Sequence, residues 1–215
     1  MRSFLSSSAT SKLNIFNALC ELLKVESLDG ISVRQICEEA KVGKTTFYAH
    51  FKDKYDVLLW YSDLAHEVGV GQIGRTLTWK EGHRLTTEAL LFERDALSRG
   101  AESHDFNSIN YHSGRWREKS LTHTLTEHRH VEMTERLRYQ IVALAEAEIA
   151  IAKRYFSIKD QGARMPVNEY ISVLVSIVPR EIYELLEKPL SLPGEEEENR
   201  KRILELTILQ MQSRQ

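Results

Sequence analysis

Residues 31–54 read ISVRQICEEAKVGKTTFYAHFKDK. Apolar side chains recur at helical spacing on both sides of a short turn, at Val33, Ile36, Ala40, Val42, Phe47 and Phe51. This pattern predicts two short helices joined by a turn of about three or four residues. The remaining face carries hydrogen-bond donors and one aromatic ring but no acid, at Arg34, Lys44, Thr45, Thr46, Tyr48, His50 and Lys54. Such a pair, with a polar and cationic second helix, predicts a helix-turn-helix.

Polar residues mark where the helices of this stretch begin. Ser32 followed by Gln35 has the spacing of a capping box for the first helix. Gly43 can cap the second helix and Asp53 the helix that follows. Lys41 falls in the turn, where we expect a left-handed backbone conformation that costs about 1 kcal/mol for a residue other than glycine.

The composition favours a helical protein without a membrane segment. The 215 residues include only 4 Pro and 10 Gly, which favours long helices over a turn-rich β fold. No apolar run approaches the roughly 20 residues of a membrane helix, and the first residues contain no apolar core of signal-peptide length. We therefore expect a cytoplasmic protein with no membrane partner, in which Cys20 and Cys37 are reduced and buried.

The net charge of −2 does not by itself indicate nucleic-acid binding. Residues 1–60 contain eight Lys and Arg against seven Asp and Glu, so this segment is only weakly basic. Four lysines and one acid, Asp53, lie within residues 41–54. The basic character is a local patch, and we expect DNA binding to require two copies of it.

The rest of the chain predicts an all-α protein of about nine helices. Glycines at 69–74 indicate a helix end or hinge, and Pro179 indicates that the apolar helix around it restarts. We divide the chain into an N-terminal DNA-binding domain, residues 1–60, and a larger helical domain, residues 61–215. The predicted helices are 10–28, 32–40, 44–50, 54–64, 80–100, a weak one from 115, 131–156, 167–188 and 198–213.

Residues 10–60 resemble the DNA-binding domain of the TetR family of transcriptional regulators. The resemblance rests on Ser32, Val33, Arg34, Ile36, Ala40, Val42, Lys44, Thr46, Phe47, Tyr48, His50, Phe51 and Lys54. It departs from the family pattern at three positions. Members often have Gly where Lys41 stands, Ser where Gly43 stands, and an aromatic or basic residue where Ala49 stands. The resemblance implies a regulator, most commonly a repressor, that binds a double-stranded, pseudo-palindromic DNA operator as a homodimer and responds to a small-molecule effector.

The chemistry of the second helix agrees with DNA binding. Phe47 and Phe51 share one face and anchor the helix, which leaves Lys44 and Ala49 towards a groove, where Lys can reach guanine acceptors and Ala a thymine methyl. Hydroxyl, imidazole and ammonium groups suit phosphate oxygens, which set the register more than the sequence read. The predicted DNA-binding residues are Ser32, Arg34, Lys44, Thr45, Thr46, Tyr48, Ala49, His50 and Lys54.

The last apolar helices are the predicted dimer interface, as in similar proteins with a four-helix interface. One apolar face would cover the protomer core and the other would contact the partner copy. The predicted contacts are Ile171, Val173, Leu174, Ile177, Ile203, Leu206 and Leu209. The candidates for an effector pocket are Tyr111, Trp116, Tyr139, Glu148 and Tyr155, although core packing explains each aromatic equally well. For Glu148, pairing with a nearby arginine is the favoured interpretation.

Other functions find little support in the sequence. Gly43-Lys44-Thr45 imitates a phosphate-binding loop, but Glu38 stands where that motif needs a glycine and no strand precedes it. His123, Glu127, His128 and His130 do not share one helix face, and the cysteines lack the spacing of a zinc site. We therefore predict no metal, no cofactor and no catalytic residues. Three alternatives stay open: an activator, a DNA-binding dimer without an effector, and an enzyme with an appended helix-turn-helix.

Overall fold

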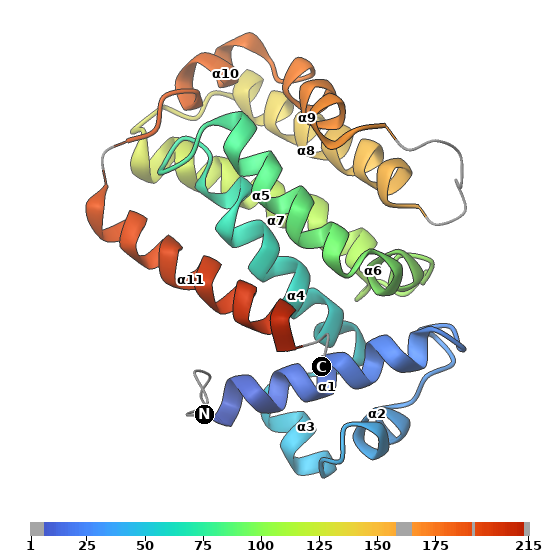
Figure 1. Ribbon diagram of the computed structural model, residues 1–215. Helices are drawn as coiled ribbons and strands as arrows, with labels where there is room; N and C mark the ends of the chain where they lie inside the picture. Colours follow the sequence, from blue (N-terminus) through green and yellow to red (C-terminus); the bar gives the residue numbers. More distant parts are fainter. Residues whose placement is uncertain (1–6, 158–164, 191, 213–215) are drawn as a thin grey trace.

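The computed structural model describes residues 7–157, 165–190 and 192–212, and the regular elements in these ranges are all helical (Figure 1). The all-α prediction is confirmed. The α-helices are α1 (Ser7–Leu23), α2 (Val33–Glu39), α3 (Lys44–His50), α4 (Lys54–Val68), α5 (Trp79–Phe92), α6 (Arg94–Gly100), α7 (Ile109–His123), α8 (Glu135–Phe156), α9 (Val167–Ser176), α10 (Arg180–Leu186) and α11 (Pro193–Gln212).

Two helix breaks explain why these eleven helices exceed the predicted nine. The predicted helix 80–100 is interrupted at Glu93, whose φ of −110° and ψ of 30° are not helical, so that it forms α5 and α6. Pro179 separates α9 from α10, as predicted, because proline has no N–H to donate within a helix. The predicted helix 198–213 begins earlier, at Pro193, and its residue 213 lies outside the described residues.

A long helix lies in the segment for which the sequence predicts only a weak helix from residue 115. α7 begins at Ile109, six residues before the predicted start at Arg115, and Ser108 stands at its N-cap. It continues into one π-helical turn, Thr124–His128. Some buried positions of α7 carry polar side chains, among them Arg117, so the helix lacks the apolar periodicity that would predict it from the sequence.

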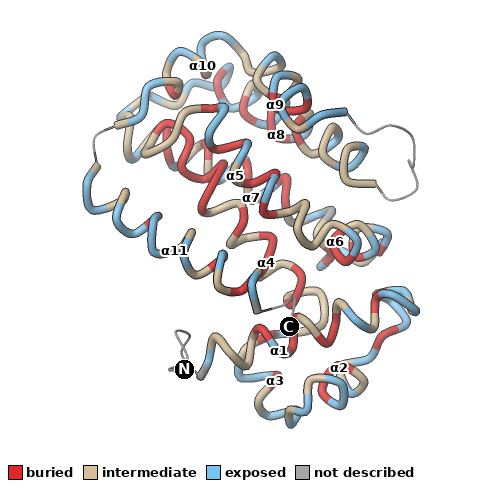
Figure 2. The backbone as a smooth tube through the Cα atoms, viewed as in Figure 1, coloured by how far each residue is buried: buried red, intermediate tan, exposed pale blue. Residues whose placement is uncertain are grey.

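α4 connects the DNA-binding helices to the rest of the molecule. The side chain of Asp53 caps this helix by accepting the N–H groups of Tyr55 and Asp56, each at 2.9 Å. α4 then runs without interruption to Val68, so the predicted boundary at residue 60 falls inside it. In Figure 2 the buried stretches follow α4 and α5 through the middle of the molecule.

One apolar core joins the two ends of α4. It contains Phe16 and Leu19 from α1, Phe47 from α3, Tyr61 from α4 and Leu97 from α6. Phe16 stacks on Tyr61 with ring centroids 4.8 Å apart, and the Tyr61 hydroxyl donates to the Ala89 carbonyl of α5 at 2.8 Å. A displacement of α5 or α6 is therefore transmitted to α1 through packed side chains.

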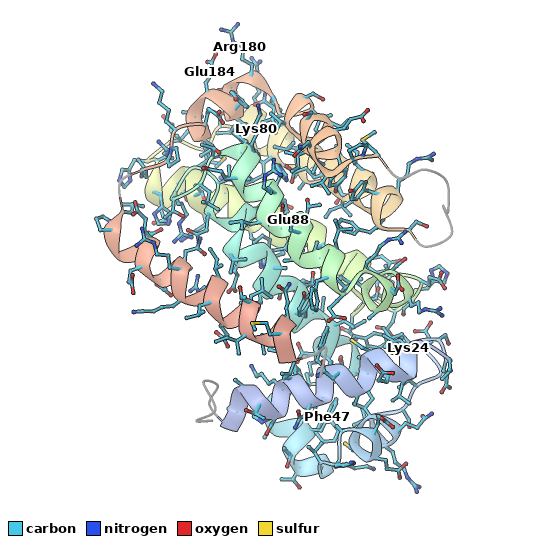
Figure 3. All side chains as sticks on the ribbon, viewed as in Figure 1. Lys24, Phe47, Lys80, Glu88, Arg180 and Glu184 are labelled. Atoms are coloured by element: carbon cyan, nitrogen blue, oxygen red, sulfur yellow. The ribbon has the colours of Figure 1, made fainter. Side chains whose placement is uncertain are left out.

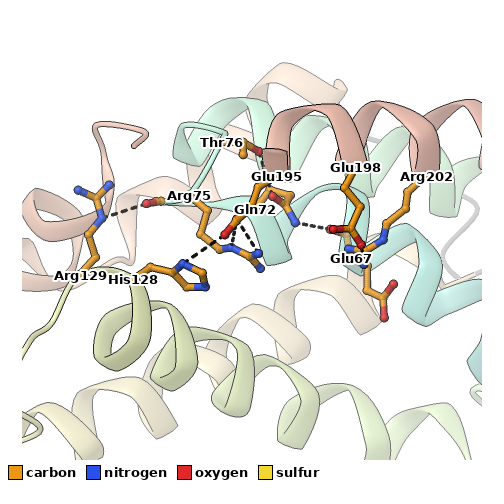
Figure 4. A network of polar contacts seen from close by, with 10 residues as sticks. Glu67, Gln72, Arg75, Thr76, His128, Arg129, Glu195, Glu198 and Arg202 are labelled. Carbon is orange, nitrogen blue, oxygen red and sulfur yellow. Dashed lines mark hydrogen bonds and ion pairs between the residues drawn. The ribbon is translucent and has the colours of Figure 1, made fainter. Parts of the chain in front are cut away.

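α11 lies along the opposite side of α4 and returns the chain towards α1 (Figure 1). Near its start, Arg75 donates to Glu195 at 2.7 Å, and His128 lies 3.4 Å from the same carboxylate (Figure 4). Further along, Asn199 donates to the Val68 carbonyl at 3.2 Å. α11 is thus fixed to the end of α4 and to the turn that follows it.

Glycine is required where α4 ends. α4 stops before Gly69, in agreement with the helix end predicted at 69–74. A Cβ atom on Gly69 would lie 2.2 Å from Thr86 Oγ1, so the close approach of this turn to α5 excludes any side chain. Gly74 has a φ of 77°, in the left-handed region that favours glycine.

Candidate nucleic-acid interface

The turn between α2 and α3 has the geometry that the sequence predicts. The Ser32 N–H donates to Gln35 Oε1 at 2.8 Å, and the Gln35 N–H donates to Ser32 Oγ at 3.3 Å, which completes the capping box. Lys41 has a φ of 55°, in the left-handed region expected for this turn. Gly43 is the N-cap of α3. These local signals set the angle between the two helices.

Two aromatic rings hold α3 against the other helices of the domain. Phe47 is completely buried and Phe51 is 3 % exposed, and both belong to the core shared with α1 and α4. Their ring centroids lie 6.0 Å apart, and Figure 3 shows Phe47 in the space beneath α1. Because these residues are four apart, they fix which face of α3 turns to solvent.

The outward face of α3 carries most of the predicted DNA-binding residues. Lys44, Thr45, Tyr48 and Ala49 are exposed, and Tyr48 keeps 58 % of its surface accessible. Tyr48 packs edge-on against Phe47 with ring centroids 5.4 Å apart, and the surface that stays accessible suits it to contact another molecule. Thr46 and His50 are half-buried at the edges of this face.

Three other predicted DNA-binding residues already have partners within the chain. Ser32 is occupied as the cap of α2. Arg34 Nε donates to Glu38 Oε1 at 2.7 Å, and both side chains are exposed, so this ion pair can exchange for a phosphate at little cost. Lys54 Nζ donates to the carbonyls of Asp29 and Ile31, each at 2.8 Å. The role of Lys54 in this structure is to tie α4 to the α1–α2 loop.

The same α1–α2 loop contacts the helical domain. Ser103, in the segment between α6 and α7, donates to Asp29 Oδ1 at 2.6 Å, and the Tyr55 hydroxyl donates to the same oxygen at 3.2 Å. Burial and the Asp29 carboxylate raise the pKa of Tyr55 to about 12. We refer to Asp29, Tyr55 and Ser103 as the joint. Sequence reasoning did not find it, because its residues lie far apart in the chain.

A cavity of ≈ 390 Å³ lies beside α4 in the helical domain. Its walls come from α4 to α8 and are mainly apolar, with Leu90, Ile109 and Phe156 among them. A second chamber of ≈ 50 Å³ adjoins it and reaches the buried residues His83, Arg117 and Glu148. These chambers are the candidate effector pocket.

Of the five predicted pocket residues, only Glu148 lines these chambers. Tyr111 is 45 % and Tyr139 69 % exposed. Trp116 packs beside His66, and Tyr155 stacks on Tyr170 with centroids 3.7 Å apart. The cavity is lined instead by residues that the sequence did not suggest, such as Ser62 and His66. No sequence signal marks these two, because they lie within the apolar pattern of α4.

Glu148 forms the ion pair that the sequence favoured. Its carboxylate accepts two hydrogen bonds from Arg117, at 2.6 and 3.2 Å, and the third Arg117 contact is to the Val70 carbonyl at 3.0 Å. Burial alone would raise the pKa of Glu148, but the charge of Arg117 and the neighbouring His83 lower it to about 2. Both ions are almost fully buried and neutralise each other.

Four of the seven residues predicted to contact a partner copy are buried within one protomer. Ile171, Leu174, Leu206 and Leu209 are at most 5 % exposed within a single protomer, where they complete its own core. Val173, Ile177 and Ile203 are half-buried and remain accessible in part. The sequence pattern shows that these positions are apolar but does not tell a core contact from a partner contact. The most exposed apolar side chains on neighbouring helices are Tyr139 and Val142 of α8, and Leu204 and Met211 of α11.

Metal and membrane features are absent from the part of the chain that the structure describes. In residues 7–157, 165–190 and 192–212, no group of three or more His, Cys, Asp or Glu side chains is arranged to hold a metal ion. His128 of the histidine-rich segment instead lies beside Glu195. No helix in the same ranges is long and apolar enough to cross a bilayer.

The fold and the exposed face of α3 define an all-α protein with a helix-turn-helix DNA-binding domain. Residues 15–59 match the family described as bacterial regulatory proteins, tetR family. Residues 15–59 therefore form a TetR-family DNA-binding domain, and the helices that follow it in the described part of the chain form an all-α domain.

Two of the solved structures that resemble this chain cover most of its length. The "Dihydroxyacetone kinase operon activator DhaS" is 16 % identical with a TM-score of 0.55, over 83 % of this chain and 98 % of that one. The TetR family repressor AlkX from Dietzia sp. strain DQ12-45-1b, implicated in biodegradation of n-alkanes, is 13 % identical with a TM-score of 0.48, over 80 % and 98 %. No curated protein sequence matches the chain. At this identity the likeness to DhaS shows the fold alone.

Proposed function

We propose that this protein is a cytoplasmic transcriptional repressor that binds a pseudo-palindromic operator as a homodimer and is controlled by a small molecule in the helical domain. The observation that carries the DNA-binding part is the face of α3, where Lys44, Thr45, Tyr48 and Ala49 are exposed while Phe47 is buried. A polar helix face anchored by apolar residues behind it fits a recognition helix in the major groove.

The joint supports control by a ligand. Ser98, Ala101 and Glu102, at the end of α6, line the large cavity. The next residue, Ser103, hydrogen-bonds to Asp29 in the DNA-binding domain at 2.6 Å. A ligand that favours one position of this segment therefore also favours one position of the DNA-binding domain, which is the condition for coupling between two sites.

We propose that the dimer forms through α8 and α9, which pack against each other. Their accessible apolar side chains are Tyr139 and Val142 on α8 and Val173 and Ile177 on α9. Val142→Asp and Val173→Asp are each expected to give monomers in sedimentation velocity. Ser172→Asp, a polar and exposed neighbour of Val173, is the matched control. A dimer that persists in both apolar variants would refute this choice of face.

Tyr48→Ala tests the assignment of α3. An operator selected from random DNA by the parent protein should bind Tyr48→Ala about 10-fold or more weakly, because each half-site loses one aromatic contact. Fluorescence anisotropy gives the affinity, and sedimentation should show an unchanged dimer. Glu39→Ala, at the exposed end of α2, is the control. Equal affinities for parent and Tyr48→Ala would refute the assignment, and a reporter gene behind the operator gives the sign of regulation.

A further inference from the structure

The two chambers beside α4 form one connected site. The larger has a volume of ≈ 390 Å³ and the smaller ≈ 50 Å³. They share the wall residues His66, Leu90, Ser113, Ile149, Ala152 and Phe156. The larger volume lies within the range of about 300–1,000 Å³ that is typical of small-molecule sites. The smaller has room for only one or two water molecules, at about 30 Å³ each.

Apolar side chains contribute most of the wall surface of the large chamber, and polar residues, among them Ser98, His104 and Ser157, also line it. Glu102 and Lys153 are exposed at its rim. At the inner end, Ser62 Oγ lies 3.3 Å from His66 Nδ1, and Ser113 Oγ donates to the Ile109 carbonyl at 2.9 Å. The inner end therefore offers neutral hydrogen-bonding groups behind an apolar passage.

The inner end has no unmatched charge for an ionised ligand to pair with. Burial, together with the positive charge of Arg117, lowers the pKa of His66 to about 4, so its imidazole is neutral at pH 7. Arg117 is already paired with Glu148 through two hydrogen bonds. A carboxylate or an ammonium group buried here would lack a counter-ion, which is costly in a site of low polarity.

The small chamber contains a buried nitrogen, His83 Nε2, that makes no hydrogen bond of good geometry. His83 is 4 % exposed, and its Nε2 has no hydrogen-bond partner in the described structure. Nε2 lies 3.4 Å from Glu148 Oε1, but without the geometry of a hydrogen bond. Buried polar atoms are rarely left unsatisfied, so a partner entering the chamber would gain a hydrogen bond there.

We propose that the chambers bind an uncharged, mainly apolar molecule with a single hydroxyl or carbonyl head. The apolar body fills the large chamber, and the head reaches the neutral groups around His66, where the small chamber with His83 adjoins. This assignment names the ligand class of the effector site, and it therefore rests on the proposed function. It excludes acids and amines that would bury their charge at the inner end.

N-phenyl-1-naphthylamine, an uncharged dye whose fluorescence rises in apolar surroundings, tests the location. The intact protein is expected to bind it with one saturable site per protomer. Ala152→Trp places an indole at the wall shared by both chambers and should abolish the signal. Ala150→Trp, exposed on the same helix, is the matched control and should bind normally. Leu90→Trp fills the same site from α5. If one of the two variants does not fold, the other still tests the location. Normal dye binding in a folded Ala152→Trp or Leu90→Trp protein would overturn the location.

Three competitors with the same alkyl chain but different head groups test whether the site prefers an uncharged ligand. 1-Decanol, decanoate and decylammonium are each titrated against the bound dye at pH 7, below their micelle concentrations. The concentration of decanol that displaces the dye should be lower than that of either ion by a factor on the order of 10 or more, because the ions must bury an unpaired charge. His66→Leu should lower the affinity for decanol by about 2- to 10-fold, which corresponds to the loss of one hydrogen bond. Equal displacement by decanoate or decylammonium would overturn the uncharged assignment, and unchanged decanol affinity in His66→Leu would overturn the position of the head.

Operator binding by the same samples separates this inference from the proposed function. A protein that binds its operator but neither the dye nor decanol would refute the ligand class and leave DNA binding intact. A protein that binds dye and decanol but no operator would refute the proposed function and leave the pocket chemistry intact. Decanol that binds without changing operator affinity would overturn its role as an effector.

Discussion

The buried ion pair between Arg117 and Glu148 gives the sharpest prediction. Glu148→Gln keeps the shape of the side chain and one acceptor oxygen, but it removes the negative charge that pairs with the guanidinium of Arg117, which is 3 % exposed. Removing one member of a buried pair typically costs about 3–5 kcal/mol. The total stability of a domain is only about 5–15 kcal/mol, so Glu148→Gln should lose a large part of it.

The pKa of Glu148 gives a second measure of the same interaction. It is lowered from 4.5 to about 2, which corresponds to about 3 kcal/mol of stability at neutral pH. Because the pKa is lower in the folded state, this stabilisation is fully present above pH 4.5 and is lost as the pH falls towards 2. The stability difference between the parent and Glu148→Gln should therefore shrink as the pH is lowered from 5 to 3.5.

Urea unfolding followed by circular dichroism at a fixed protein concentration measures these differences. Glu146→Gln, an exposed acid on the same helix, should change stability by less than about 0.5 kcal/mol. Replacing both partners, as in Arg117→Met with Glu148→Leu, should recover most of the loss, because no charge is then left unpaired. The reasoning would be refuted if Glu148→Gln cost less than about 1 kcal/mol, or if the double variant were as unstable as the single one.

Three further predictions concern the DNA-binding domain and its contact with the helical domain. Lys41→Gly should raise the free energy of unfolding by about 1 kcal/mol, since glycine adopts a φ of 55° without strain; Lys41→Ala, which removes the charge but keeps the strain, should show no gain. Lys44→Ala should reduce the salt dependence of operator binding by about one unit of slope per half-site in anisotropy titrations, and an unaltered slope would place Lys44 away from phosphate. Ser103→Ala should lower the free energy of unfolding in urea by about 1.5–3 kcal/mol, because it removes a hydrogen bond to the charged Asp29, whereas Ser172→Ala, exposed on α9, should not.

The sequence predicted the helix-turn-helix in detail because its signals are local. A capping box at Ser32, a turn at Lys41 and two phenylalanines four residues apart act within a few residues of the chain, and each has the predicted geometry. The break at Pro179 was predictable for the same reason, since a missing N–H needs no tertiary context. Local chemistry therefore accounts for the face of α3.

The pocket, the joint and the true solvent-facing apolar positions were not predictable because they depend on contacts between distant residues. Ser103 and Asp29 are separated by 74 positions, and Arg117 and Glu148 by 31. Periodicity classed Leu206 and Val173 alike as apolar, yet Leu206 is 5 % exposed while Val173 is half-buried. Which apolar residue meets the protomer core is decided by how α11 lies on α4, which no pattern within α11 reveals.

The weak charge of the DNA-binding domain has a consequence for the proposed control. With eight basic and seven acidic residues in 1–60, the domain attracts the DNA phosphates only weakly. Operator affinity in the proposed dimer therefore depends on placing two α3 helices at the spacing of the half-sites. Coupling energies of about 1–3 kcal/mol change affinity by about 5- to 150-fold. A single hydrogen bond to a charged group, such as that from Ser103 to Asp29, is worth about 1.5–3 kcal/mol. The joint is therefore of the right strength to switch a protein that binds DNA through geometry more than through charge.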